Sequence, residues 1–264
     1  MRVGTGTRDP GLGTREAGPA ACEPGSEDRG HSRQRQSRFS ESRVPGPGSR
    51  LHLYYGGTFD PFHNGHLAVA RAARDTLACR VVLVPAADPP HRAPPGADAA
   101  QRLAMVAAAV AGEPGLAVDR RELERGGPSW TVETLRELRR EYGAAAPLAW
   151  LVGADSFLSL PSWHDWQDLF GLAHFVVAER PGNALDAPLS AALAPASAGR
   201  FTAAPAELVA SPAGRIFRLQ QPLAPESASA IRQRIAAGQP WRALVPAPVA
   251  AFIDLHGLYR AAGL

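Results

Sequence analysis

The stretch YYGGTFDPFHNGHL, residues 54–67, decides the fold, because it begins as a strand and ends as a helix. Residues 51–57 have the apolar composition of a buried strand. In residues 64–78 the apolar side chains recur every three or four positions, which predicts a helix. Between them lie two glycines, a threonine, an aspartate and a pair of histidines, so we expect this turn to carry chemistry.

Strands and helices alternate in the rest of residues 51–264, which predicts an α/β domain with a parallel sheet and helices on both faces. Further strands are expected at 79–86, 116–122, 147–155, 173–180 and 214–220. Further helices are expected at 98–112, 129–143, 227–238 and 246–259, with a loop and weak helix over 182–213. Ligands of such sheets bind at the carboxyl ends of the strands, where the turn at 56–66 lies.

Residues 1–50 differ from the rest in composition. They are rich in Gly, Pro, Ser and Arg and have almost no aliphatic periodicity. Such a segment cannot bury enough apolar surface to offset its ordering entropy, so we expect a disordered tail. A start codon assigned too far upstream would also explain this composition. We therefore place a single domain at 51–264.

The charge distribution argues against a nucleic-acid partner. The chain has 28 basic and 25 acidic residues, and every basic residue is arginine. Nine arginines and six acids lie in residues 1–50, so the domain itself has no net charge and no overall basic field. We see no apolar run long enough to span a membrane. The only cysteines, Cys22 and Cys79, do not suggest a disulfide framework, which favours a cytoplasmic protein.

His63 and His66 lie about one helical turn apart, at the start of a helix. Together with Asp60 they could ligate zinc, but no further Cys or His pair at ligand spacing supports a metal site. They could also be helix caps. We favour phosphate binding, because unpaired N–H groups and the positive end of the helix dipole attract anions there. The turn matches neither the Walker A pattern nor the dinucleotide fingerprint.

The motifs of residues 51–264 together resemble those of bacterial nicotinate-nucleotide adenylyltransferases, within the nucleotidyltransferases that carry an H-x-G-H motif. GGTFDPFHNGHL resembles the superfamily signature. Six further segments resemble the family's motifs in the same order: ADPPHR, SWTVETL, LVGADSFLSLPSWHDWQDL, ERPG, SASAIRQRIAAG and LVPAPVAAFIDLHGLY. The resemblance implies a Rossmann-like fold.

The resemblance also implies a reaction in which ATP and nicotinic acid mononucleotide give deamido-NAD and pyrophosphate, a step of NAD biosynthesis. The attacking phosphate oxygen is already anionic, so no general base is required. Catalysis is expected from positioning and charge neutralisation. Mg²⁺ is the implied cofactor, bound through the ATP phosphates rather than by a metal site of the protein. Homo-oligomerisation is left open.

Site residues are implied by the same resemblance. His63, His66 and Arg232 are expected to be catalytic, by holding the phosphates and stabilising the leaving pyrophosphate. Contacts with ATP are expected from Gly57, Thr58, Phe59, His63, His66, Asp155, Ser229 and Arg232. Contacts with the mononucleotide are expected from Arg92, Thr131 and Trp163.

Four of these residues have a structural alternative. Asp155 could contact a ribose hydroxyl, cap the next helix, or do both. Trp163 could stack on the pyridine ring or pack in the core. Thr131 could contact the nicotinate group through its backbone or cap a helix, and Arg92 could be a solvated loop residue.

Departures from the family's motifs concern substrate preference. Arg92 stands in place of lysine, Trp130 in place of tyrosine, and Ala228 in place of a hydroxyl residue. Two alternative acceptors stay open, the amide mononucleotide and another phosphorylated acceptor such as phosphopantetheine, because the motif around His63 would look alike in all of these enzymes. A non-catalytic nucleotide-binding role on the same fold also stays open.

Overall fold

The computed structural model describes residues 51–87, 96–179, 189–221 and 227–260. The chain divides into two units, Met1–Val44 and Pro45–Leu264, and every described residue belongs to the second. The expected tail at 1–50 therefore lies outside the described residues, and the domain boundary at residue 50 stays a prediction.

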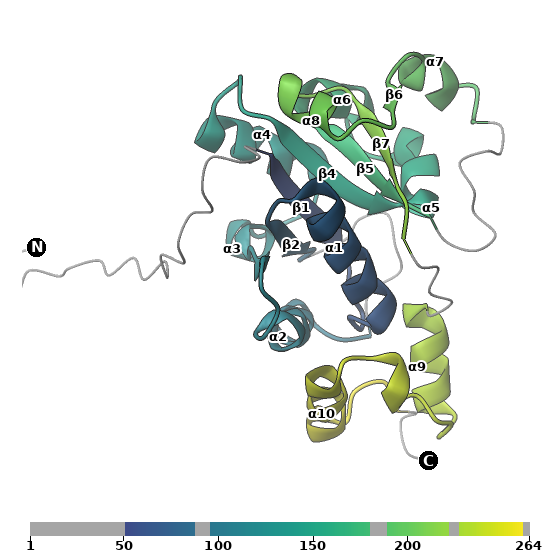
Figure 1. Ribbon diagram of the computed structural model, residues 1–264. Coiled ribbons are helices and arrows are strands. Elements are labelled where there is room, and N and C mark those ends of the chain that lie inside the picture. Colours follow the sequence, from purple (N-terminus) through teal and green to yellow (C-terminus); the bar gives the residue numbers. More distant parts are fainter. Residues whose placement is uncertain (1–50, 88–95, 180–188, 222–226, 261–264) are drawn as a thin grey trace, which may run out of the picture. The chain divides into compact units, whose positions relative to one another are not determined.

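A seven-stranded parallel sheet forms the centre of the second unit (Figure 1). Its strand order is β3-β2-β1-β4-β5-β7-β6, and each neighbouring pair is parallel. The strands are β1 (His52–Gly57), β2 (Val81–Pro85), β3 (Leu116–Val118), β4 (Leu148–Gly153), β5 (His174–Ala178), β6 (Phe201–Thr202) and β7 (Ile216–Leu219). The predicted α/β class with a parallel sheet is confirmed.

The α-helices are α1 (Asn64–Leu77), α2 (Ala99–Val110), α3 (Arg121–Arg125), α4 (Thr131–Tyr142), α5 (Ala154–Leu158), α6 (Leu169–Leu172), α7 (Leu193–Ser197), α8 (Ala206–Ala210), α9 (Ala228–Ala236) and α10 (Ala247–His256). Short 3₁₀ turns are η1 (Leu160–Ser162), η2 (Trp166–Asp168) and η3 (Arg242–Leu244). In the parts of the chain that the structure describes, no helix is long and apolar enough to cross a membrane.

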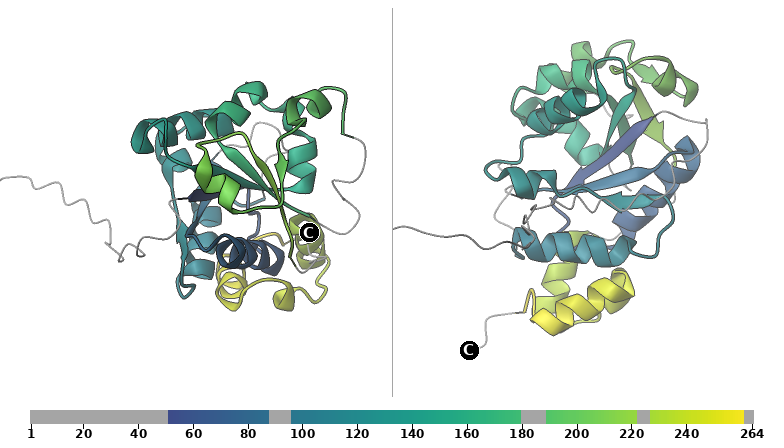
Figure 2. Two further views of the ribbon diagram at one scale, coloured as in Figure 1. Left: turned by 45° about the horizontal axis from the view of Figure 1, so that its top comes forward. Right: turned by 90° about the vertical axis from the view of Figure 1, so that its left-hand side faces the viewer.

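Helices cover both faces of the sheet (Figure 2). Leu53 and Leu83 belong to a core that the sheet forms with α1, α2, α9 and α10. Tyr54 and Trp150 point to the opposite face, into a core formed with α4, α5 and α6. Successive side chains of a strand point to opposite faces, so strands covered on both sides are apolar throughout. This explains the continuous apolar runs in the sequence.

The sequence prediction was wrong in two regions. The strand expected at 116–122 ends at Val118, because the Asp119 carboxylate accepts hydrogen bonds from the backbone N–H and side chain of Arg121, and this turn starts α3. The described part of 182–213 contains two short helices, α7 and α8, in agreement with the expected weak helix, but it also contains strand β6, which was not expected. Strand β6 has only two residues, too few for a periodic pattern.

The strand order reverses direction at β1. Strand β1 pairs with β2 on one side and with β4 on the other. The connections leaving β1 and β4 therefore diverge at their carboxyl ends, which is where open α/β sheets form a ligand crevice. The turn that joins β1 to α1 and contains His63 begins at this point.

Candidate active site

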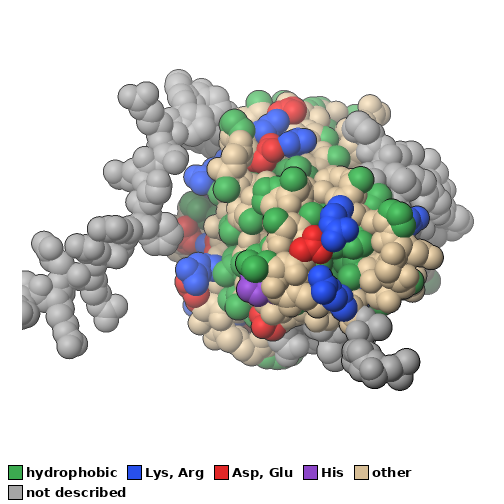
Figure 3. Space-filling model, turned by 90° about the horizontal axis from the view of Figure 1, so that it is seen from below, with side chains coloured by type: hydrophobic (Ala, Val, Ile, Leu, Met, Phe, Trp, Pro, Cys, Tyr) green, Lys and Arg blue, Asp and Glu red, His purple; other side chains and the backbone are tan. Residues whose placement is uncertain are grey.

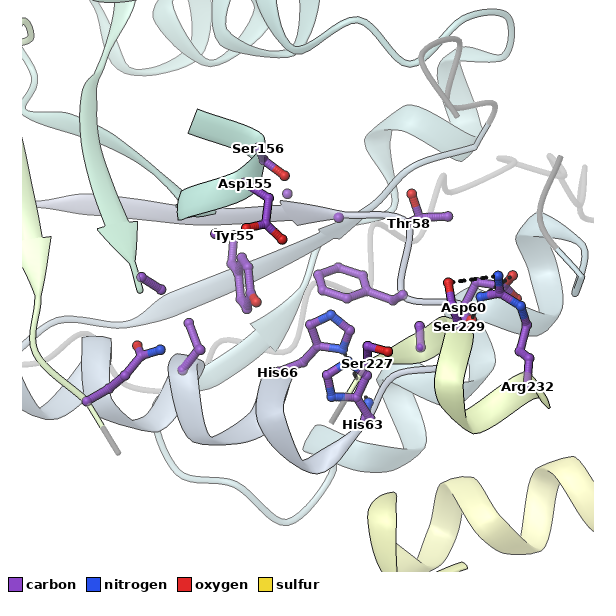
Figure 4. Close-up of a pocket in the computed structure, with 18 residues that line it drawn as sticks. Tyr55, Thr58, Asp60, His63, His66, Asp155, Ser156, Ser227, Ser229 and Arg232 are labelled. Atoms are coloured by element: carbon purple, nitrogen blue, oxygen red, sulfur yellow. Dashed lines mark hydrogen bonds and ion pairs between the residues drawn. The ribbon is translucent and has the colours of Figure 1, made fainter. Parts of the chain in front are cut away.

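Two adjoining cavities lie at the carboxyl ends of the strands. The first, of about 470 Å³, includes His63, His66 and Arg232 in its lining and is called the histidine pocket below. It extends from the end of β1 to the ends of β4 and β5 and to the first turns of α1, α5 and α9 (Figure 4). The structure therefore has a cavity at the carboxyl edge of the sheet, where the sequence predicts that ligands bind.

The second cavity, of about 200 Å³, includes Thr131 and Trp163 and is called the tryptophan pocket. It lies between the carboxyl ends of β1, β2 and β4 and the start of α4. The two pockets share four lining residues: Gly56, Gly57, Thr58 and Ser156. Ligands in the two pockets would therefore meet at the end of β1.

The two histidines stack on each other beside the histidine pocket. Their ring centroids are 3.7 Å apart, with an angle of 28° between the planes. His63 is the N-cap residue of α1, and its backbone N–H donates to Nδ1 of His66 at 3.3 Å. Phe59 and Phe62 pack against the ring of His66, with centroids 5.1 and 5.4 Å away. The capping alternative thus describes part of their role, while both side chains still line the pocket.

Packing explains the glycine pair before the turn. A Cβ on Gly56 would lie 2.1 Å from the indole of Trp150, and one on Gly57 would lie 2.7 Å from the ring of Phe59. Both glycines are in β1, and the turn itself follows at Thr58 and Phe59, where Phe59 has φ of 52°. The tight turn therefore follows the glycines and does not include them. The glycines let two aromatic rings approach the backbone instead.

Helix α9 brings Ser229 and Arg232 to the same cavity. Its N-cap residue, Ser227, accepts a hydrogen bond from the N–H of Ala230 at 3.2 Å. Arg232 donates to the Asp60 carbonyl oxygen at 2.6 Å and to the Ser229 hydroxyl at 3.3 Å, as Figure 4 shows. The start of this nine-residue helix thus faces the pocket with hydroxyls and one guanidinium.

Asp155 and Ser156 enter the pocket from the start of α5 (Figure 4). The N-cap residue of α5 is Gly153, so Asp155 lies within the first turn and the capping alternative is wrong. A carboxylate in the first turn of a helix still interacts favourably with the helix dipole. Its position opposite the histidines, across the end of β1, suits a ribose hydroxyl better than a phosphate.

Thr131 and Trp163 line the tryptophan pocket, as does a residue that the sequence analysis did not select, His164. The ring of His164 stacks on Trp130 at 4.0 Å and 24°. Thr131 is the first residue of α4 and makes no capping hydrogen bond with its side chain, because Trp130 occupies the N-cap position. Trp163 also packs against the core beneath the pocket, while its stacking on the pyridine ring stays a prediction.

A buried carboxyl at the base of the tryptophan pocket was also missed. Glu122 is 4% exposed and accepts a hydrogen bond from the Thr134 hydroxyl at 2.7 Å. Burial raises the pKa of Glu122, although hydrogen bonds from Thr134 and Ser129 act in the opposite direction. Ser129 in turn accepts from the N–H of Ala87 at 2.8 Å and joins the end of β2 to the start of α4. Nothing in the periodicity of 121–125 distinguishes Glu122 from a surface residue.

The zinc alternative is not supported. Among the residues that the structure describes, no group of three or more His, Cys, Asp or Glu side chains could hold a metal ion. The Asp60 carboxylate accepts from the N–H groups of Gly96 and Ala97 and from the Tyr259 hydroxyl. It therefore organises the loop instead of joining the histidines.

Most of the predicted residues meet at the two pockets. The histidine pocket includes Gly57, Thr58, Phe59, His63, His66, Asp155, Ser229 and Arg232. The tryptophan pocket includes Thr131 and Trp163. Arg92 lies outside the described residues. The contacts expected from each of these residues stay predictions.

Comparisons with known proteins show the family to which the chain belongs. The family model described as cytidylyltransferase-like matches residues 54–234. A protein of Stenotrophomonas maltophilia (strain K279a), named "Probable nicotinate-nucleotide adenylyltransferase", is 61% identical over 215 residues, which cover 80% of this chain and 97% of the relative. A protein of the same name from Xylella fastidiosa (strain M12) is 47% identical over 213 residues, 79% of this chain and 96% of the relative.

Solved structures show the same fold at lower sequence identity. The nicotinic acid mononucleotide adenylyltransferase of Plasmodium falciparum, complexed with NaAD, superposes with a TM-score of 0.58 and 14% identity. The match covers 80% of this chain and 98% of that one. The same enzyme complexed with APC gives a TM-score of 0.55.

Proposed function

The chain belongs to the nicotinate-nucleotide adenylyltransferase family, and we propose that its adjoining pockets hold the two substrates of that reaction. The enzyme transfers the adenylyl group of ATP to nicotinic acid mononucleotide and releases pyrophosphate. The family resemblance stated from the sequence is confirmed. ATP is assigned to the histidine pocket and the mononucleotide to the tryptophan pocket.

The observation that carries this assignment is the wall common to both pockets. Gly56, Gly57, Thr58 and Ser156 line both cavities, so a phosphate from each ligand can reach the same place. The nucleophile is a phosphate oxygen that is already charged. The task of the protein is therefore to hold two anions in line and to neutralise the charge that develops, which is the main source of rate in phosphoryl and nucleotidyl transfer.

The histidine pocket has the donors that this task needs. His63 and His66 are proposed to hold the triphosphate, together with the N–H groups at the start of α1. From the other side, Ser229 and Arg232 at the start of α9 are proposed to grip the outer phosphates and to stabilise the leaving pyrophosphate. A fixed donor of this kind contributes on the order of a hundredfold or more to the rate.

Asp155 is proposed to accept a hydrogen bond from the ribose of ATP, since it lines the pocket opposite the histidines. In the tryptophan pocket, Trp163 is proposed to stack on the pyridine ring and Thr131 to contact the nicotinate group. Arg92 is proposed as a further phosphate contact from the segment 88–95.

Mg²⁺ is proposed as the ion that accompanies the triphosphate. Oxygen donors line the pocket at Thr58, Asp155 and Ser229, and oxygen is the ligand that Mg²⁺ prefers. Such an ion keeps several waters and binds mainly through phosphate oxygens, so it needs no cluster of protein ligands. When bound, it would reduce the negative charge on the phosphates.

Partners beyond the small-molecule substrates stay predictions, and so does the cytoplasmic location. On the face shown in Figure 3, basic side chains lie among acidic and hydrophobic ones. An exposed pair near the C-terminal helix is formed by Arg242 and Asp254, 2.8 Å apart. This distribution supports the expectation that no nucleic acid is bound.

The test is pyrophosphate release by the purified chain with ATP and each pyridine mononucleotide in turn. A clear preference for the acid in kcat/KM is expected. A preference for the amide would move the substrate assignment to that alternative. ATP binding without turnover with either mononucleotide or with phosphopantetheine would support a non-catalytic role.

A further inference from the structure

Arg102 of α2 is a buried cation that lines neither pocket. It is 1% exposed. Its side chain donates to four backbone carbonyls: Nε to Ala97 at 3.2 Å, Nη1 to Thr58 at 2.8 Å and to Ala86 at 2.5 Å, and Nη2 to Ala87 at 2.8 Å. One guanidinium thus joins the segment after β1, the segment after β2 and the residue before the α2 cap.

The carbonyls that Arg102 binds belong to the walls of the site. Thr58 lines both pockets, and Ala86 lines the tryptophan pocket. In a trans peptide the C=O and the next N–H point in opposite directions. Fixing the carbonyl of Ala86 therefore also directs the N–H of Ala87, which donates to the Ser129 hydroxyl at 2.8 Å on the far side.

The same geometry applies at the end of β1. Arg102 holds the carbonyl of Thr58, so the N–H of Phe59 points away from the guanidinium. Phe59 lines the histidine pocket, and its backbone is one of the groups proposed to contact the phosphates. The direction of this N–H thus depends on a side chain that never touches the ligand.

We propose that Arg102 is a positioning residue for the adenylyl transfer, which holds the loops after β1 and β2 at a fixed spacing and so orients the backbone donors of both pockets. This inference rests on the proposed function, because the reaction that Arg102 would serve is the adenylyl transfer proposed above. A planar fork is needed to reach carbonyls from three segments, whereas the single ammonium of lysine presents a point charge with different geometry. Without a donor, these carbonyls, of which those of Thr58, Ala86 and Ala87 are partly buried, would lose their partner, and the loops would shift to find others.

Arg139 of α4 provides a matched control. It donates to the carbonyls of Leu172 at 2.6 Å, Ala146 at 2.5 Å and Pro212 at 2.6 Å. These residues precede β5, β4 and β7, respectively, at the edge of the sheet opposite the pockets, and Arg139 lines neither pocket. It therefore holds backbone by the same chemistry, but away from the site.

The experiment compares Arg102→Met, Arg102→Lys and Arg139→Met with the wild-type chain. Melting temperatures come first, and kinetics follow at a temperature where every variant is folded. Arg102→Met should lower kcat/KM for both substrates by about ten- to a hundredfold, the usual cost of misplaced reacting groups. Arg102→Lys should melt at a temperature between those of Arg102→Met and the wild type, but its kcat/KM should stay close to that of Arg102→Met. Arg139→Met should lower the melting temperature and change kcat and both KM values by no more than about twofold.

Kinetics of both folded Arg102 variants within about twofold of wild type would overturn the proposal, as would an equal loss of activity in Arg139→Met. If Arg102→Met does not fold, Arg102→Lys decides by the same criterion. If neither folds, Arg102 has a purely structural role and the proposal fails. If the wild-type chain itself shows no turnover, the proposed function fails instead. In that case calorimetry measures the ATP affinity of the wild-type chain and of the same variants. An affinity that the Arg102 substitutions leave unchanged overturns the proposal for Arg102.

Discussion

The hydroxyl of Tyr259 donates to the carboxylate of Asp60 at 2.7 Å, although the two residues are 199 positions apart. The same carboxylate accepts from the N–H groups of Gly96 and Ala97 at 2.8 and 3.1 Å, and Arg232 lies 3.5 Å from it. Asp60 is 4% exposed. The segment after α10, the segment before α2 and helix α9 therefore meet on one buried carboxylate beside the histidine pocket.

Tyr259→Phe removes this hydroxyl and leaves a buried carboxylate with one donor fewer. The free energy of unfolding should fall by about 1–3 kcal/mol, the cost of a lost hydrogen bond to a charged group. Urea unfolding measures the change. Tyr142→Phe is the control, since the Tyr142 hydroxyl bonds that of Tyr54 at 2.9 Å but belongs to an exposed side chain. An equal fall in the free energy of unfolding in the two variants would show that the bond to Asp60 is no more stabilising than the bond between the two tyrosine hydroxyls.

Gly56→Ala should destabilise the domain, because its Cβ would lie 2.1 Å from the indole of Trp150. Trp150 is 2% exposed and packs in the core on that face of the sheet, so overpacking should cost about 1–3 kcal/mol. Thermal melting checks this. The matched substitution is Gly112→Ala, where nothing lies within 4 Å of the new Cβ. If both variants melt at the wild-type temperature, the packing explanation of Gly56 is wrong.

His174 should make stability depend on pH. Its ring, in β5, bonds the Ser211 carbonyl at 2.8 Å and accepts the Arg215 N–H at Nδ1, 3.0 Å away. Burial lowers the pKa of His174 below its usual 6.5. Below pH 6.5 the unfolded chain takes up a proton there that the folded chain does not, so the free energy of unfolding falls as the pH drops.

Urea unfolding between pH 7.5 and 5 tests this, with His174→Gln as the variant. Its slope against pH in the acid range should be shallower than that of the wild type, by up to about 1.4 kcal/mol per pH unit. His256→Gln, on the exposed end of α10, should keep the wild-type slope. An unchanged slope in His174→Gln would show that this histidine is not the source of the pH dependence of stability.

Trp163→Ala should affect one substrate only. Trp163 lines the tryptophan pocket and not the histidine pocket. Loss of ring stacking, worth about 0.5–1.5 kcal/mol, should raise KM for nicotinic acid mononucleotide by roughly two- to tenfold and leave KM for ATP unchanged. Trp166→Ala removes a neighbouring indole that packs on the same core but lines neither pocket, so it should leave both values unchanged. A rise in KM for ATP alone would reverse the assignment of the pockets.

The sequence was informative where the relevant residues are close together or follow a strand. His63 and His66 share one turn of α1, and Asp155 directly follows β4, so their placement at the carboxyl edge could be expected. Strands β1 and β5 were also predictable, because strands buried on both faces have continuous apolar runs.

The missed features depend on contacts between distant positions. Arg102 shares the buried face of α2 with Met105 and Val106, but its partners are backbone carbonyls, which have no signature in the sequence. Tyr259 reaches Asp60 only after α10 has packed against α2. Glu122 was assigned to a strand because the turn at Asp119 was not recognised.

The central claim is that the paired imidazoles hold the triphosphate, and kcat for pyrophosphate release by His66→Ala tests it most directly. With ATP and nicotinic acid mononucleotide at saturation, kcat should fall on the order of a hundredfold or more relative to wild type. His256→Ala, a change at an exposed histidine of α10, should stay within about twofold. A folded His66→Ala protein that turns over at the wild-type rate would contradict the account.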